Sequence, residues 1–156
     1  MKTKLAFFDI DGTLSAPYYP VDGVMKPGMT DEQWLTFCKT YGEDSYRFCK
    51  PVGPVKRYAE ELRKEGAELY VLSASQSVDE DLSKDRFIER CYPGLFCKVI
   101  TVRSDEEKIP KILSIAAGAE VPPAACELIE DTYQNVLQAV NHGIKGTHIS
   151  QLMWDL

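Results

Sequence analysis

The sequence lacks the long hydrophobic runs that mark membrane proteins and secreted precursors. Near its start, an apolar run from Leu5 to Phe8 gives way after four residues to Asp9. Such a run is shorter than a signal peptide's apolar region or a membrane-spanning helix requires. We therefore expect a protein of the cytoplasm that does not enter a membrane.

Histidine is scarce, and cysteine shows no pattern typical of a metal site. The two histidines, His142 and His148, share no ligand spacing and accompany no nucleophile. The five cysteines are odd in number and contain no Cys-x-x-Cys pair. We interpret the cysteines as reduced structural thiols, His142 as a residue near a helix end and His148 as a strand residue.

The sequence has fewer basic than acidic residues. The chain has 18 Lys and Arg against 24 Asp and Glu, which gives a formal net charge of −6 at pH 7. The acidic residues gather in short groups, such as residues 79–81 and 105–107, that suit the starts of helices. Because no broad basic surface is evident, duplex nucleic acid is not expected as a partner. The sequence leaves the oligomeric state open.

What is present is a regular alternation of strand-like and helix-like segments. Five largely apolar runs predict strands, and residues 5–8 are uninterrupted, as in a strand buried on both faces. Helical periodicity between these runs predicts four helices, three of them followed by glycine. The expected strands are residues 5–8, 68–72, 97–102, 126–129 and 145–149, and the expected helices are residues 55–65, 78–90, 108–117 and 134–141.

This alternation favours an α/β fold with three layers, in which helices cover both faces of a Rossmann-like parallel sheet. With 156 residues, 44% of them hydrophobic, the chain has the size of one domain, residues 1–156. Functional sites in such sheets lie at the carboxyl ends of the strands. Polar residues follow or end three of the expected strands, namely Asp9 with Asp11, Ser73, and Glu130 with Asp131.

Residues 15–53 interrupt the alternation directly after the strand that leads to Asp9. The segment is rich in proline, glycine and aromatic residues, and it predicts a helix at 31–40 with Thr30 as the N-cap. Its position predicts a flap, or minimal cap, over the site. Its aromatic residues either fill a satellite core or contact the substrate, and both interpretations stay open. They are Tyr18, Tyr19, Trp34, Phe37, Tyr41, Tyr46 and Phe48.

Asp9 and Asp11 are candidate metal ligands. They lie at a strand end and in the tight turn that Gly12 permits, so several oxygen atoms come close together. Mg²⁺ prefers such oxygen ligands. A lone Asp-x-Asp is also common turn chemistry, but a carboxylate directly after four apolar residues would be costly without a partner.

The residues around Asp9 resemble a known family. Residues 7–14, Phe-Phe-Asp-Ile-Asp-Gly-Thr-Leu, look like the first motif of the haloacid dehalogenase superfamily of phosphatases. Val71-Leu72-Ser73 resembles the second motif, an apolar strand that ends in Ser or Thr. Four motifs in the expected order make the resemblance specific.

The third and fourth motifs lie further along the chain. Lys108 resembles the lysine of the third motif, with Lys111 as a rival. Glu130 and Asp131 resemble the acidic fourth motif in its Glu-Asp form. The resemblance extends from residue 5 to about residue 149, and only residues 15–53 match no part of the pattern.

The resemblance implies a covalent mechanism. Asp9 would attack the phosphorus and form an aspartyl-phosphate, while Asp11 would protonate the leaving group and later deprotonate a water molecule. Ser73 and the amides near it would bind the phosphoryl oxygens, and Lys108 would offset their charge.

The resemblance also implies a magnesium site. Its ligands would be a carboxylate oxygen of Asp9, the main-chain carbonyl of Asp11 and the carboxylate of Asp131, with Glu130 reached through water. The implied activity is hydrolysis of a small-molecule phosphate ester. Because no large lid is evident, bulky phosphomonoesters, including nucleotides, are candidate substrates. The alternative is a binding or regulatory module that keeps the fold but has lost turnover.

Overall fold

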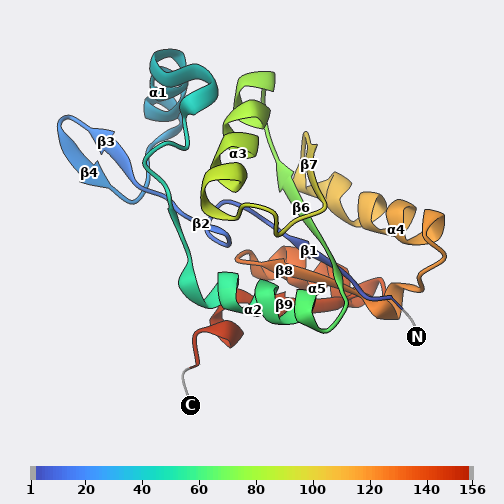
Figure 1. The fold of residues 1–156 in the computed structure, drawn as a ribbon. Helices are drawn as coiled ribbons and strands as arrows, with labels where there is room; N and C mark the ends of the chain where they lie inside the picture. The colour runs from blue at the N-terminus through green and yellow to red at the C-terminus, as the bar shows by residue number, and fades with distance from the viewer. Residues whose placement is uncertain (1–2, 155–156) are drawn as a thin grey trace.

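The computed structural model describes residues 3–154, which fold around one parallel β-sheet (Figure 1). The strands follow the order β7-β6-β1-β8-β9, and every adjacent pair is parallel. The connections between them pass through helices, because parallel neighbours need a crossover. The strands are β1 (Leu5–Phe8), β6 (Glu68–Ala74), β7 (Lys98–Val102), β8 (Cys126–Glu130) and β9 (Lys145–His148).

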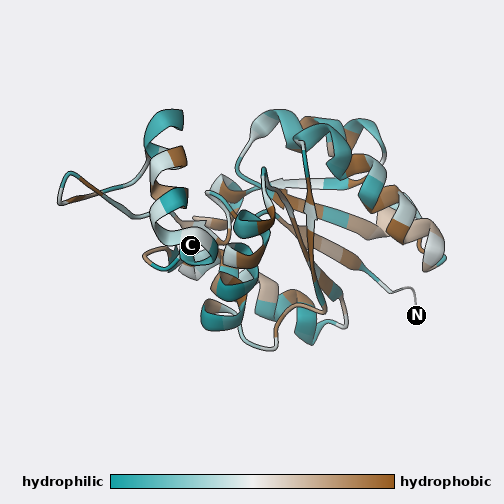
Figure 2. Ribbon diagram, turned by 90° about the horizontal axis from the view of Figure 1, so that it is seen from above, coloured by the Kyte–Doolittle hydropathy of each residue, from teal (hydrophilic) through white to brown (hydrophobic). Residues whose placement is uncertain are grey.

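Four helices cover the two faces of the sheet: α2 (Gly53–Lys64), α3 (Val78–Cys91), α4 (Lys108–Gly118) and α5 (Tyr133–Asn141). Side chains of β1 alternate between two apolar clusters. Phe8 packs with residues of α2 and α3, whereas Phe7 packs with residues of α4 and α5. Burying each ring stabilises the fold by roughly 1.5–3 kcal/mol. The expected α/β class with three layers is therefore confirmed, and Figure 2 shows hydrophobic strands between helices with hydrophilic outer faces.

The segment between β1 and α2 forms small elements of its own. Two short strands, β2 (Ser15–Ala16) and β5 (Lys50–Pro51), pair at its base. Between them lie the hairpin of β3 (Tyr19–Val21) and β4 (Val24–Lys26) and the helix α1 (Asp31–Tyr41). In Figure 1 the hairpin and α1 stand beyond the sheet, and α1 lies between the hairpin and α3.

Helix α1 begins where the sequence predicts. The Thr30 hydroxyl accepts a hydrogen bond from the Gln33 amide at 3.2 Å, and the Gln33 side chain accepts one from the Thr30 amide at 2.9 Å. This reciprocal pair satisfies two amides at the helix start. The predicted N-cap is therefore confirmed.

Helix α3 fastens the inserted segment to the rest of the chain. The Ser83 hydroxyl accepts a hydrogen bond from the Ser45 amide at 3.2 Å. The Arg90 guanidinium donates to the carbonyl oxygens of Tyr46 and Cys49 at 3.0 and 3.2 Å. These bonds hold the C-terminal part of the insertion, from η1 (Gly42–Asp44) to β5, against the flank of α3.

All five cysteines have free thiols, and Cys49 and Cys126 are buried. Over residues 3–154, no helix combines the length and apolar character needed to cross a membrane.

Glu127 is a buried charge on β8, just before the fourth motif. Its side chain is fully buried on β8 and accepts hydrogen bonds from the Tyr58 hydroxyl at 2.6 Å and the Thr147 hydroxyl at 2.7 Å. It also pairs with the Lys4 ammonium at 2.8 Å. Burial opposes ionisation, but the three donors outweigh it and hold the pKa of Glu127 below its ordinary value.

We expect Glu127→Gln to lower the free energy of unfolding by about 2–4 kcal/mol near neutral pH, because it removes a buried, hydrogen-bonded charge. Since the pKa of this carboxyl is lower in the folded state, its contribution is present above the ordinary glutamate pKa. It disappears as the pH falls through the depressed folded value. Urea unfolding across a pH series should therefore show the two proteins converging in acid.

The control is Glu60→Gln, a change on the exposed side of α2. It should alter the unfolding free energy by less than about 0.5 kcal/mol at every pH. A Glu127→Gln effect that stays constant into strong acid would contradict the assignment of the stabilising role to the ionised carboxyl.

Candidate active site

Three carboxylates meet at the carboxyl edge of the sheet. Asp9, Glu130 and Asp131 each place an oxygen within 4.8 Å of the others. Strand pairing brings them together, because Phe8 of β1 lies opposite Ile129 of β8 and the acidic residues follow directly. Asp9 and Glu130 are buried, and Asp131 is partly exposed. The structure thus brings together three residues that the sequence predicts for one site.

Lys108 is the cation that faces this cluster. From the first turn of α4 its ammonium lies 2.9 Å from Glu130 Oε2 and 3.2 Å from Asp9 Oδ1, and its side chain is buried. Burial alone would lower the pKa of Lys108, but the charges of Asp9 and Glu130 raise it above its ordinary value. Lys111 is exposed on the same helix, so Lys108 and not its rival reaches the carboxylates.

The cluster holds more negative charge than one lysine balances. Burial, and then the charge of Asp9, raise the pKa of Glu130 to about 9. Burial raises the pKa of Asp9 as well, although Lys108 opposes the shift. Crowded, partly desolvated carboxylates of this kind suit a hard divalent cation, which favours their ionised forms.

Gly12 makes the approach of Asp131 possible. Its backbone has a φ of +77°, a conformation that side chains rarely adopt. A Cβ atom at this position would also clash with the Asp131 carboxylate. The glycine of the first motif is therefore required by both the turn and the neighbouring acidic residue.

His148 contacts the main chain of Asp131. The Ser150 amide donates to His148 Nδ1 at 3.1 Å, so the other ring nitrogen carries the hydrogen and donates to the Asp131 carbonyl at 2.8 Å. The ring also stacks on Tyr133, with centroids 3.8 Å apart. The sequence indicates only a strand residue here, because the contact depends on the pairing of β8 with β9.

Asp11 lies at the mouth of the site and contacts the insertion. About half of its side chain is exposed, and Oδ1 accepts a hydrogen bond from the Tyr46 hydroxyl at 2.6 Å. Burial, and then the charge of Asp11, raise the pKa of Tyr46 well above its ordinary value, so the tyrosine stays a donor. No local motif singles out Tyr46 among the aromatic residues of the insertion.

Ser73 lies near the end of β6, where its hydroxyl meets a second buried lysine. Lys84, on α3, lies 2.8 Å from Ser73 Oγ and 3.5 Å from Asp11 Oδ2. In the sequence, Glu80 and Lys84 resemble an ordinary solvated pair four residues apart on a helix. Sequence reasoning therefore missed Lys84.

A cleft of about 460 Å³ opens beside Asp11. One side is lined by residues of the insertion, two of them from α1: Tyr19, Met29, Asp31, Trp34 and Tyr46. The other side is lined mainly by residues near the ends of β6 and β7, among them Ser75, Gln76, Arg103, Ser104 and Asp105. Three of the seven aromatic residues of the insertion therefore reach the cleft. Others, such as Phe37, pack behind Tyr19 and Trp34, so the interpretation as a satellite core holds for that part of the set. Contact with a substrate stays a prediction for the residues that reach the cleft.

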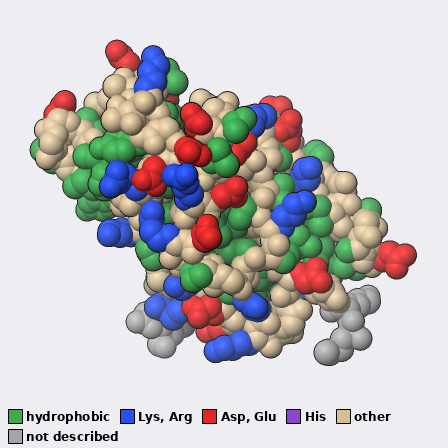
Figure 3. All heavy atoms as spheres, turned by 45° about the horizontal axis from the view of Figure 1, so that its top comes forward, with side chains coloured by type: hydrophobic (Ala, Val, Ile, Leu, Met, Phe, Trp, Pro, Cys, Tyr) green, Lys and Arg blue, Asp and Glu red, His purple; other side chains and the backbone are tan. Residues whose placement is uncertain are grey.

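Arg103 is the one cation among the residues that line this cleft. Its guanidinium forms two hydrogen bonds with the Asp81 carboxylate, at 2.8 and 3.0 Å, and a third with the Ser75 carbonyl. Arg103 is thus already paired. On the face seen in Figure 3, acidic and basic side chains are intermingled.

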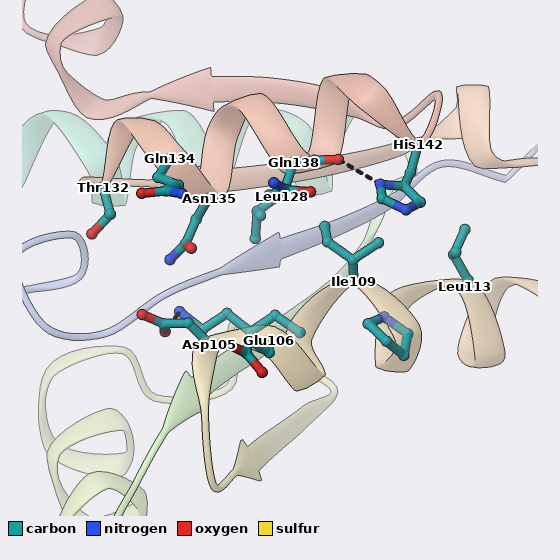
Figure 4. Close-up of a pocket in the computed structure, with 12 residues that line it drawn as sticks. Asp105, Glu106, Ile109, Leu113, Leu128, Thr132, Gln134, Asn135, Gln138 and His142 are labelled. Atoms are coloured by element: carbon teal, nitrogen blue, oxygen red, sulfur yellow. Dashed lines mark hydrogen bonds and ion pairs between the residues drawn. The ribbon is translucent and has the colours of Figure 1, made fainter.

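A second hollow, of about 580 Å³, lies between α4 and α5 (Figure 4). Apolar side chains such as Ile109 and Leu113 face polar residues of α5, such as Asn135, and its C-cap His142, whose ring lies 2.8 Å from the Gln138 carbonyl. The three clustered carboxylates line neither hollow, and Lys108 lines the second one. Because Asp11 and aromatic residues of the insertion line the first cleft, that cleft is the better candidate for the substrate.

No family model matches the sequence, and no curated protein matches it. Solved structures do share its fold. A protein from Lactobacillus delbrueckii subsp. bulgaricus, assigned as a phosphoglycolate phosphatase, has a TM-score of 0.64 and 15% identity, covering 93% of this chain and 85% of that one. A phosphoserine phosphatase, solved as an analogue of its phospho-aspartyl intermediate, has a TM-score of 0.63 and 14% identity, covering 93% and 86%.

A third structure is 3-deoxy-D-manno-octulosonate 8-phosphate phosphatase from Moraxella catarrhalis, in complex with magnesium and phosphate ions. It has a TM-score of 0.57 and 18% identity, and the match covers 94% of this chain and 67% of that one. The fold that the resemblance to the haloacid dehalogenase superfamily implies is therefore confirmed.

We expect Lys108→Met to lower the unfolding free energy of the metal-free protein by roughly 2–4 kcal/mol, because it leaves Asp9 and Glu130 without their cation. Lys111→Met, on the exposed side of the same helix, should change it by less than about 0.5 kcal/mol. Guanidinium unfolding in the presence of a chelator measures both. Equal effects of the two substitutions would contradict the placement of Lys108.

Proposed function

We propose that this chain is a Mg²⁺-dependent phosphomonoester hydrolase that acts through an aspartyl-phosphate on Asp9. The observation that carries the proposal is the cluster of Asp9, Glu130 and Asp131 beside the buried ammonium of Lys108. The fold supports it, since structural neighbours are named as phosphatases, one of them an analogue of a phospho-aspartyl intermediate.

The donor set fits a magnesium ion. Carboxylate oxygens of Asp9 and Asp131 and the main-chain carbonyl of Asp11 would hold it, and Glu130, already paired with Lys108, would be reached through water. When bound, Mg²⁺ would neutralise charge on the phosphoryl group. The neighbour solved with magnesium and phosphate supports this choice of ion.

In the first step, a carboxylate oxygen of Asp9 forms a bond to phosphorus, and the bond from phosphorus to the ester oxygen breaks. The departing oxygen takes a proton from Asp11, and the alcohol leaves through the cleft. Lys108 keeps Asp9 in place and offsets its charge as the phosphate approaches.

In the second step, Asp11 removes a proton from water, whose oxygen attacks the phosphorus. The bond between Asp9 and phosphorus breaks, inorganic phosphate is released and the free carboxylate of Asp9 is restored. The exposed half of the Asp11 side chain gives water access to this group.

The alternative is a module with this fold that binds a ligand without turnover. Each residue that the mechanism needs is present in the sequence, so no inert replacement favours that alternative. Turnover of any phosphate ester decides between the two.

We expect the protein to release p-nitrophenol from p-nitrophenyl phosphate only with Mg²⁺ present. Asp9→Asn should reduce the rate at least about 10³-fold, because the amide cannot act as the nucleophile. Glu60→Gln, at an exposed position of α2 that does not line the cleft, serves as the matched control and should keep the wild-type rate. An asparagine variant as active as wild type would rule out the covalent mechanism, and an inactive wild type would favour the binding module.

The aromatic residues of the cleft support a bulky leaving group such as a nucleoside. We expect nucleoside monophosphates to be hydrolysed with a higher kcat/KM than ribose 5-phosphate, because a base can stack on Trp34. Trp34→Ala should lower kcat/KM for the nucleotides about tenfold and leave ribose 5-phosphate within about twofold. Tyr18→Ala, at an exposed aromatic residue outside the cleft lining, is the control. Equal turnover of both substrate classes by wild type would contradict this substrate class.

A further inference from the structure

Lys84 is buried completely, which is unusual for a lysine. Its side chain has no exposed surface, although it lies on a helix whose outer face is polar. Removing an ammonium from water costs several kcal/mol unless partners replace the water. Its partners are the Ser73 hydroxyl at 2.8 Å, the Ala74 carbonyl at 2.6 Å, and the Asp11 and Glu80 carboxylates at 3.5 and 3.7 Å.

The direction of the bond to Ser73 follows from chemistry. A lysine ammonium only donates hydrogen bonds, so Ser73 Oγ must be the acceptor in its contact with Lys84. The hydrogen of the serine hydroxyl is then left for another acceptor. Lys84 therefore makes Ser73 a donor and polarises its hydroxyl at the same time.

The location of Ser73 gives that donor an evident use. Val71 pairs with Phe8, so Ser73, two residues further along β6, lies level with the loop that follows Asp9. Two of the backbone amides that follow are engaged, since Ser75 donates to the Val102 carbonyl and Gln76 to the Glu80 carboxylate. Because Lys84 uses only the oxygen of the Ser73 hydroxyl, the hydrogen of this group remains available to an acceptor in the site.

We propose that Lys84 is a positioning residue that fixes Ser73 as a hydrogen-bond donor to the phosphoryl group of the substrate. Two buried lysines then serve the site from opposite faces of the sheet: Lys108 from α4 holds Asp9, and Lys84 from α3 holds Ser73. The inference rests on the proposed function for its role in turnover, but binding of inorganic phosphate tests it separately.

A purely structural role would give a different result. In that case Lys84 would only fasten α3 to β6, and its loss would affect phosphate binding whether or not Ser73 is present. A double-mutant cycle between Lys84→Met and Ser73→Ala separates the two roles, because methionine keeps the length of the side chain without its donors.

We expect Lys84→Met to weaken binding of inorganic phosphate, measured by calorimetry with Mg²⁺ present, about tenfold. It should lower kcat/KM for p-nitrophenyl phosphate about 30- to 100-fold, as for other single donors to a developing anion. In the Ser73→Ala background, the same substitution should change either quantity by less than about threefold. The control Lys56→Met removes a part-buried lysine that donates to the Cys91 carbonyl and should change neither.

Equal losses in the two backgrounds would overturn the proposal, even if the enzyme is active. If wild type binds phosphate but hydrolyses no ester, the proposed function fails while the binding cycle still decides the role of Lys84. Circular dichroism establishes that each variant is folded. Should Lys84→Met not fold, Lys84→Gln takes its place in the cycle, where a retained amide donor predicts a smaller loss that again requires Ser73.

Discussion

The placement of buried charge at the carboxyl edge of the sheet is the constraint on which the rest of the site depends. Asp9 and Glu130 lie almost out of contact with water, next to a lysine that is also buried. Any one of these groups alone would destabilise the fold, because the charge would have no solvent and no partner. Together they partly neutralise one another, and the negative charge that remains favours the binding of a cation.

Each of the two helix layers contributes a different part of this arrangement. The layer of α4 and α5 supplies Lys108, and the layer of α2 and α3 supplies Lys84. The strand β1 lies between them in the middle of the sheet, so its end is the point that both layers can reach. The chemistry proposed for Asp9 is therefore a property of the central strand, which explains why so short an element carries the most distinctive residues.

Much of the fold was predictable, because the signals are local. Apolar runs, helix caps and glycines act within a few residues, and the strand and helix bounds follow them closely. Four residues of the candidate site, Asp9, Ser73, Lys108 and Asp131, were also named from the sequence. Lys84, Tyr46 and His148 were not, since each acts through a contact that only strand pairing or helix packing creates. A charged residue on a helix looks the same in sequence whether it faces water or the interior.

The anchoring of the insertion to α3 has a bearing on which molecule would accept the phosphoryl group in the proposed reaction. Ser83 and Arg90 bind the backbone of the insertion next to Tyr46, which in turn contacts Asp11. A segment tied down in this way does not seal the site around a substrate, and Asp11 keeps half of its surface in solvent. In the proposed reaction, bulk water would then reach the intermediate first, because its concentration far exceeds that of any competing alcohol. A site that stays open to water in this way is suited to hydrolysis. Transfer of the phosphoryl group to a specific second substrate would require a site that excludes water.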